Sequence, residues 1–332
     1  MTVRDLRPAA LFLVLAMASA CSVGDATSAS PASVPPLTAV DTPLERGEAE
    51  VSEGPTRRAA TTAASLQRFS KKRAMRHVRF LARTIGVRTK TSRNERRAAR
   101  YVADKMSSFG YEAKIQKFQV NGRTSRNVVA RWPGAARYPL VVGAHIDSVP
   151  GSPGANDNAS GTAVIIELAR IFAGKPQAHW VTFVGFGAEE YDSAGTTHHN
   201  GSKTFVARLG DRGRTRLAGM ISVDMVADGR PLLIGNSAIS GRHKVANSLY
   251  NTARKRNIAA RRITLCDCSD HGPFEHAGID AGFTYSGSEP DYHSPSDVPA
   301  NLQPRDLVRS GRAIRYYVRK LDKRFIAWLR AS

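Results

Sequence analysis

The stretch from Tyr138 to Phe172 reads YPLVVGAHIDSVPGSPGANDNASGTAVIIELARIF, and it decides the fold of this chain. It starts with an apolar run typical of a buried strand, crosses a glycine-rich loop, and ends in a run that predicts a helix. The loop holds His145, Asp147 and Asp157. Open α/β sheets carry their chemistry at such strand ends, so this loop is a candidate site as well as a turn.

Strand and helix patterns alternate on both sides of this stretch. Helices are expected at 63–84, 92–110, 158–173, 241–256, shortly after Asp270, and at 303–329. Strands are expected at 111–120, 125–132, 138–145, 179–187, 217–226, 261–265 and 281–286. The dipeptide Asn121-Gly122 predicts a hairpin turn between the first two. We therefore expect an α/β fold, a single three-layer sandwich with a mixed, largely parallel central sheet and helices on both faces.

The composition of residues 1–62 is not that of a folded domain. Residues 1–21 have early arginines, an apolar run and then small residues, which is a secretory signal too short to span a membrane. Cleavage before Cys21 with acylation of its thiol would make a lipoprotein, whereas ordinary cleavage near Ala20 would release the protein. Residues 22–62 are rich in Ser, Ala, Pro, Thr and Glu, so a disordered tether is expected. Residues 63–332 then form the folded domain.

The charge of the chain is strongly positive. Its 332 residues include 49 Lys and Arg against 28 Asp and Glu, a formal net charge of +21. Such a surface could suggest nucleic acid, but an exported protein rarely meets it. We expect no nucleic-acid partner and interpret the basic helix faces as adapted to an anionic cell envelope.

Three cysteines leave one question open. Cys21 is either lipidated or removed with the signal, so only Cys266 and Cys268 remain in the folded domain. An exported location permits a disulfide, yet a gap of one residue makes a strained bridge. A disulfide and two free thiols are equally compatible with this pattern.

Residues that can bind metal gather at the predicted strand ends. They are His145, Asp147, Asp157, Glu189, Glu190, Asp224 and His293. Ionised groups that converge would repel one another unless a cation lies among them. Two imidazoles with several carboxylates suit zinc, or a pair of zinc ions, better than calcium, which prefers oxygen ligands. Neighbouring residues on an extended chain point apart, so one of Glu189 and Glu190 would bind metal and the other would serve as a base toward a metal-bound water.

Five motifs in this order resemble a known family. The segments GAHIDS, GANDNASGTA, FGAEE, SVDMV and SDHGPF with DYHSPSD resemble the secreted bacterial two-zinc aminopeptidases of metallopeptidase family twenty-eight. The resemblance covers 127–302 and implies that His145, Asp157 and Asp224 hold one zinc ion. Asp157 would bridge to a second zinc ion completed by Glu190 and His293.

The same resemblance implies roles for residues around the metal ions. Glu189 would be the general base, and Tyr292 would donate a hydrogen bond to the oxyanion of the tetrahedral intermediate. Asp147 would orient the imidazole of His145. A cis peptide bond is implied between Asp157 and the residue that follows it.

The chain also departs from the family pattern. Asp192 and Ser193 follow the glutamate region where the family usually has glycine and leucine, so substrate preference is open. We interpret His198 and His199 as residues of a surface loop rather than metal ligands. Three consecutive residues cannot form a catalytic triad, so Asp270, between a serine and a histidine, is expected to lie behind the ligands instead.

These residues predict a zinc-dependent aminopeptidase that hydrolyses N-terminal residues from peptides with a free N-terminus. We expect two zinc ions per chain and a monomer, exported either as an envelope lipoprotein or as a secreted protein. The alternative is a glutaminyl cyclase, an acyltransferase with the same fold that uses a single zinc ion. A binding module without activity is disfavoured because all five ligands and the base are present.

Overall fold

The structure of this chain is a computed structural model. The described residues are 68–136, 139–191, 197–229, 231–287 and 289–331. The predicted signal (1–21) and tether (22–62) lie outside the described residues, so the domain boundaries stay a prediction. No helix among the described residues is both long and apolar enough to cross a membrane.

Eight described strands form one mixed sheet in the order β1-β2-β4-β3-β5-β8-β6-β7. They are β1 (Glu112–Val120), β2 (Arg123–Arg131), β3 (Leu140–His145), β4 (Val181–Phe186), β5 (Gly219–Val223), β6 (Leu232–Asn236), β7 (Ala260–Thr264) and β8 (Ala281–Tyr285). Strands β4, β3, β5 and β8 pair in parallel at the centre of the sheet, whereas β2 joins β4 and β6 joins β8 in antiparallel fashion. The expected α/β fold with a mixed, largely parallel sheet is confirmed.

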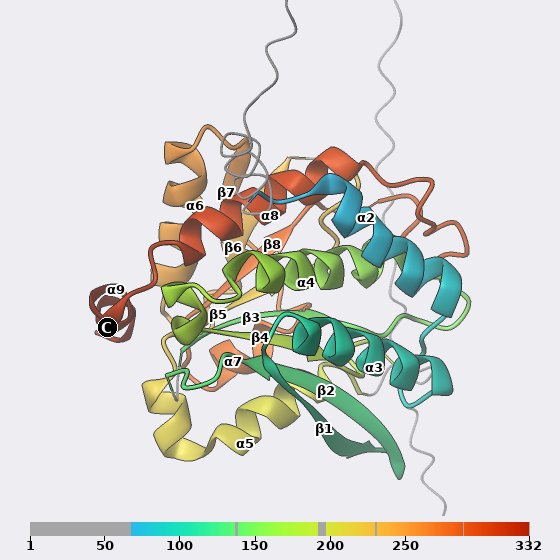
Figure 1. Cartoon of the computed structure of the whole chain (residues 1–332), viewed down its shortest axis with the longest axis horizontal. Helices are drawn as coiled ribbons and strands as arrows, with labels where there is room; N and C mark the ends of the chain where they lie inside the picture. The colour runs from blue at the N-terminus through green and yellow to red at the C-terminus, as the bar shows by residue number, and fades with distance from the viewer. Residues whose placement is uncertain (1–67, 137–138, 192–196, 230, 288, 332) are drawn as a thin grey trace, which may run out of the picture. The chain divides into compact units, whose positions relative to one another are not determined.

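Helices cover both faces of this sheet (Figure 1). The α-helices are α2 (Lys71–Arg79), α3 (Arg93–Ser108), α4 (Gly161–Phe172), α5 (Asn200–Arg216), α6 (Lys244–Lys255), α7 (Gly272–His276), α8 (Pro304–Val318) and α9 (Lys323–Arg330). Shorter helical segments are η1 (Phe80–Ile85), η2 (Ala155–Ser160) and η3 (Pro176–Trp180). Helices α2, α3, α4, α6 and α8 pack on one face, and α5 and α7 pack on the other, which makes three layers.

The alternation of side chains along the central strands separates two apolar cores. In β3, Leu140 and Val142 point into the larger core, which contains α4. Val141, between them, joins the smaller core with Phe205 of α5 and Phe274 of α7. Successive side chains of a strand point to opposite faces, so a strand that is buried on both faces reads as a continuous apolar run.

Particular residues determine where some of these helices and strands begin or end. The side chain of Ser92 accepts a hydrogen bond from the backbone N–H of Glu95 at 3.0 Å, which caps α3. Asn121 and Gly122 have φ angles of 49° and 74°, and they form the predicted hairpin turn between β1 and β2. Both angles are positive, as the two central residues of a type I′ turn require.

The structure differs from the predicted elements in two respects. The closing helix expected at 303–329 is two helices, because Asp322 begins a second one by accepting a hydrogen bond from the N–H of Phe325 at 2.7 Å. Helix α5 and strand β6 were not predicted. Gly210 interrupts α5 with a φ of 61°, which weakens its helical pattern, and β6 is only 5 residues long.

Candidate active site

The parallel strands bring the metal-binding candidates to one edge of the sheet. His145 is the last residue of β3, Glu189 and Glu190 follow β4, and Asp224 directly follows β5. Because β4, β3 and β5 are parallel neighbours, their carboxyl ends meet at this edge. Asp157 reaches the same place from η2, just before α4.

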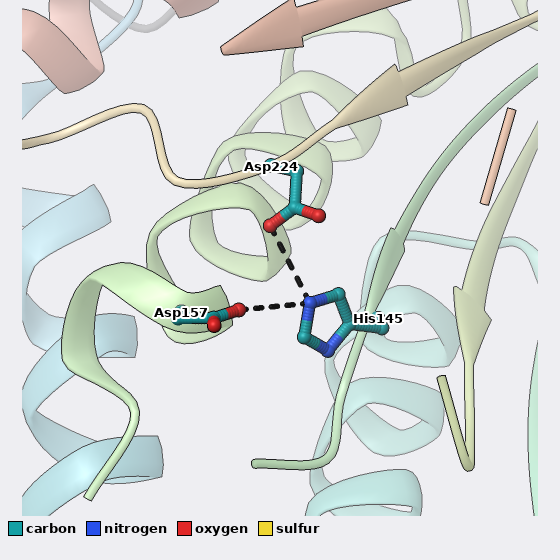
Figure 2. Close-up of side chains that lie close together, drawn as sticks. All are labelled: His145, Asp157 and Asp224. Carbon is teal, nitrogen blue, oxygen red and sulfur yellow. Dashed lines mark ion pairs between the residues drawn. The ribbon is translucent and has the colours of Figure 1, made fainter. Parts of the chain in front are cut away.

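The first cluster consists of His145, Asp157 and Asp224. The Nε2 atom of His145 lies 3.0 Å from Asp157 Oδ1 and 3.4 Å from Asp224 Oδ1. Figure 2 shows both carboxylates directed at the same imidazole nitrogen from different elements. One donor atom from each of the three residues lies within 4.8 Å of the others, which is close enough for a single metal ion.

The second cluster shares Asp157 with the first. The Nε2 atom of His293 lies 3.1 Å from Asp157 Oδ2 and 3.1 Å from Glu190 Oε2. Asp157 therefore contributes one carboxylate oxygen to each cluster, which is the arrangement of a bridging ligand. The five residues expected to bind metal are together in space.

The chemistry of these residues fits a bound metal ion. Burial raises the pKa values of Glu189 and Glu190 well above their usual range, and the charges of nearby carboxylates raise them further. Asp224 Oδ1 and Glu190 Oε1 are buried and make no hydrogen bond. A cation between the clusters would stabilise the ionised carboxylates and use these oxygens. Imidazole nitrogens mixed with carboxylate oxygens suit zinc.

The loop that carries Asp157 is held by several hydrogen bonds. The carboxylate of Asp297 accepts the backbone N–H of Asn156 at 2.6 Å and that of Asp157 at 3.0 Å. The amide of Asn158 donates to the Val223 carbonyl at 2.9 Å, which ties the loop to the end of β5. The peptide bond between Asp157 and Asn158 is cis, as the family resemblance implied.

Asp147 contacts the glutamate pair more closely than it contacts His145. Its two carboxylate oxygens accept the backbone N–H groups of Glu189 at 3.1 Å and Glu190 at 3.2 Å. The distance from Asp147 Oδ1 to His145 Nδ1 is 3.6 Å, longer than a hydrogen bond. In this structure Asp147 therefore fixes the backbone that presents both glutamates.

The surface position expected for His199 is wrong. Its side chain is only 3% exposed, and its Nε2 atom lies 2.9 Å from Glu189 Oε1. The residue directly precedes α5, which packs against the sheet. His198 is half-buried and stacks on the ring of Tyr191. Among the described residues, neither histidine belongs to a cluster that could hold a metal.

Asp270 and Tyr292 border the two clusters. Asp270 is buried, and burial together with the charge of Glu189 raises its pKa to about 8. The ring of Tyr292 stacks on that of His293 with 3.7 Å between centroids, and its side chain remains partly exposed. Burial and the charges of Asp157 and Glu190 raise the pKa of Tyr292, so its hydroxyl stays protonated near neutral pH.

Three contributors to the site were not identified from the sequence. His199 contacts Glu189, Asp297 holds the Asp157 loop, and the hydroxyl of Ser269 donates to Asp224 Oδ2 at 2.8 Å. Asp297 lies inside the quoted DYHSPSD motif, so its position was a usable signal. Nothing in the local pattern around His199 shows that it turns inward.

The cysteine question is resolved by the structure. Cys266 and Cys268 are joined in a disulfide, one of the two alternatives left open by the sequence.

Residues 127–318 match peptidase family M28, and the chain belongs to this family. Among curated relatives, aminopeptidase YwaD of Bacillus subtilis is 32% identical over 212 residues, which are 60% of this chain and 45% of YwaD. The probable lipoprotein aminopeptidase LpqL of Mycobacterium tuberculosis is 28% identical over 231 residues, 58% of this chain and 45% of LpqL. The chain thus spans about half the length of these relatives.

Solved structures share the fold. BSAP, described as a zinc aminopeptidase from Bacillus subtilis, has a TM-score of 0.69 at 20% identity. The match covers 77% of this chain and 97% of the BSAP chain. A glutaminyl cyclase from Fimbriiglobus ruber has a TM-score of 0.67 at 22% identity. The match covers 76% of this chain and 96% of the cyclase chain. The fold is therefore shared by proteins of both activities that the sequence left as alternatives.

Proposed function

We propose that this protein is a zinc-dependent aminopeptidase that removes N-terminal residues from peptides. The observation that carries this proposal is the pair of clusters joined through Asp157, with the carboxylate of Glu189 beside them. Membership of peptidase family M28 and the aminopeptidase names of the relatives support it.

Two zinc ions per chain fit the two clusters. His145, Asp157 and Asp224 would hold one ion, and Asp157, Glu190 and His293 would hold the other. When bound, zinc would supply Lewis acidity toward the scissile carbonyl and the attacking water.

The protein's own side chains would then bind the substrate and move the proton. Glu189 would accept a proton from the attacking water and return it to the leaving amine. Its Oε2 atom lies 4.0 Å from His145 Nε2, so this oxygen faces the first cluster. Tyr292, with its protonated hydroxyl, would donate to the developing oxyanion. The free α-amine of the substrate would be held by the acidic groups, of which Glu189 and Asp224 are the nearest candidates.

The alternative activity is that of a glutaminyl cyclase, which the fold also accommodates. A cyclase closes an N-terminal glutamine on itself with one zinc ion and releases ammonia. The cluster around His145, present in addition to the cluster around His293, favours the aminopeptidase, because a one-metal enzyme needs only one cluster and no bridging carboxylate.

We also propose that the protein is exported and held at the cell envelope through a lipid on Cys21. The signal-like pattern of residues 1–21 supports export. The name of the relative LpqL, a probable lipoprotein aminopeptidase, supports the lipid anchor. Release by cleavage near Ala20 is the competing outcome.

Metal removal tests the proposed activity. We expect a chelator to abolish hydrolysis of leucyl p-nitroanilide by the purified protein, and zinc to restore it at two ions per chain by elemental analysis. Peptides with an acetylated N-terminus should be poor substrates, because they lack the positive charge that the acidic groups would bind. Full activity in metal-free protein would contradict the proposal, and one zinc per chain with rapid ammonia release from N-terminal glutamine would identify a cyclase.

A further inference from the structure

His199 is fastened to the segment that carries Glu189. Its backbone N–H donates to the Glu189 carbonyl at 2.7 Å, and the N–H of Asn200 donates to the Ala188 carbonyl at 2.9 Å. The residue has a φ of 55° and directly precedes α5. The start of this helix and the chain that leaves β4 are therefore held side by side, so the position of His199 follows that of the glutamate.

The imidazole of His199 contacts oxygen Oε1 of the Glu189 carboxylate. Nε2 lies 2.9 Å from Oε1, whereas Oε2 is the oxygen that lies 4.0 Å from His145 Nε2. The two oxygens of Glu189 thus have different surroundings, and one of them is left to face the metal clusters.

Aromatic packing holds the imidazole in this orientation. The ring of His198 lies 4.0 Å from that of His199 between centroids, and the ring of Tyr191 stacks on His198 at 4.4 Å. The His199 side chain is 3% exposed, so water does not compete for this contact with Glu189.

We propose that His199 is a positioning residue for the general base, because it holds Glu189 Oε1 and so presents Oε2 to the attacking water. The inference rests on the proposed function, in which Glu189 is the base. A base held in one orientation accepts the proton without first losing rotational freedom. This benefit arises only in the transition state, so loss of His199 lowers kcat and leaves KM nearly unchanged.

Two substitutions of His199 test the contact. His199→Phe keeps an aromatic ring but has no donor, and we expect kcat for leucyl p-nitroanilide to fall about tenfold to a hundredfold. His199→Gln retains an amide N–H near the position of Nε2 and should recover a large part of that loss. Zinc content and Tm are measured for each variant, since a structural role would change these instead.

His198→Phe is the matched control. This residue lies in the same segment, and its ring packs against those of Tyr191 and His199 rather than against the carboxylate of Glu189. We expect its kcat to stay within twofold of the wild-type value. An equal loss of kcat in the His198 and His199 variants would overturn the inference, because the effect would then come from the loop as a whole.

A double-mutant cycle with Glu189→Gln completes the test. If His199 acts through the carboxylate of Glu189, adding His199→Phe to Glu189→Gln should lower kcat by less than twofold further. If His199→Phe lowered kcat by the same factor in Glu189→Gln as in the wild type, the positioning role would be overturned. The assignment of Glu189 as the base would not be affected. An unchanged kcat in Glu189→Gln itself would overturn the base assignment, and the positioning role with it.

Discussion

Glu189 and Glu190 are neighbours in sequence but meet different partners. Oε2 of Glu190 lies 3.1 Å from His293 Nε2, within the second cluster. The carboxylate of Glu189 contacts His199 and belongs to neither cluster. Asp147 binds the backbone N–H groups of both glutamates, so the peptide between them cannot rotate freely to exchange these positions.

Substitution of each glutamate should therefore have a different effect. Glu189→Gln should lower kcat by about 100- to 10,000-fold with zinc content near that of the wild type, because general-base catalysis needs the carboxylate. Glu190→Ala should instead lose zinc, because it removes an expected ligand. Elemental analysis and steady-state kinetics on both variants check this. If Glu189→Gln lost the metal and Glu190→Ala kept it, the two roles would be reversed.

The sequence predicts the elements that carry most of the site, but not all of its contacts. The strand, loop and helix around His145 and Asp157 could be identified because the apolar runs are long and the glycines mark the turn. The inward turn of His199 could not, because it depends on α5 packing against the sheet. A residue at the start of a helix has no periodic pattern of its own.

Arg88 is a second feature that no local pattern indicates. It is fully buried, and its guanidinium donates to backbone carbonyls on two segments. The acceptors are the carbonyls of Leu81, Gly86, Ile146, Pro153 and Gly154. Burial lowers its pKa to about 10, so the side chain still carries its charge at neutral pH. Arg88 thus joins the end of η1 to the loop between β3 and α4.

Removing this guanidinium should loosen the loop and destabilise the fold. Arg88→Met leaves several buried carbonyls without a donor, and we expect a loss of at least about 3 kcal/mol, or about 6–12 °C in Tm. Arg88→Lys keeps the charge but has fewer donors, so its loss should be smaller. Arg83→Met, at an exposed position in η1, is the control and should stay within about 0.5 kcal/mol of the wild type. Equal Tm values for the Met variants at 83 and 88 would contradict this account.

Two properties of the whole chain would determine where it is found. A net charge of +21 attracts it to anionic surfaces, and a lipid on Cys21 would anchor it there. Salt separates these contributions, because ions screen charge but do not weaken the burial of an acyl chain.

We expect the wild-type protein to stay in the membrane fraction after a wash in 1 M salt. Cys21→Ala should alter processing of the signal and shift the protein to the soluble fraction in the same wash. Fractionation, with mass determination of the mature N-terminus, checks both results. Wild-type protein found entirely in the medium and beginning at Cys21 without lipid would show the secreted alternative.

If Asp157 binds both metal ions, as we propose, metal content is also linked to the order in which the chain is made. The first cluster draws on residues up to Asp224, whereas the second cannot form until His293 has been synthesised. All eight described strands end before that residue. A product whose translation stopped between Tyr285 and His293 would therefore contain every described strand and the first set of expected ligands, yet lack His293 of the second set. Such a product would also lack α8 and α9, whose apolar side chains belong to the larger core, so we expect it neither to fold stably nor to retain zinc.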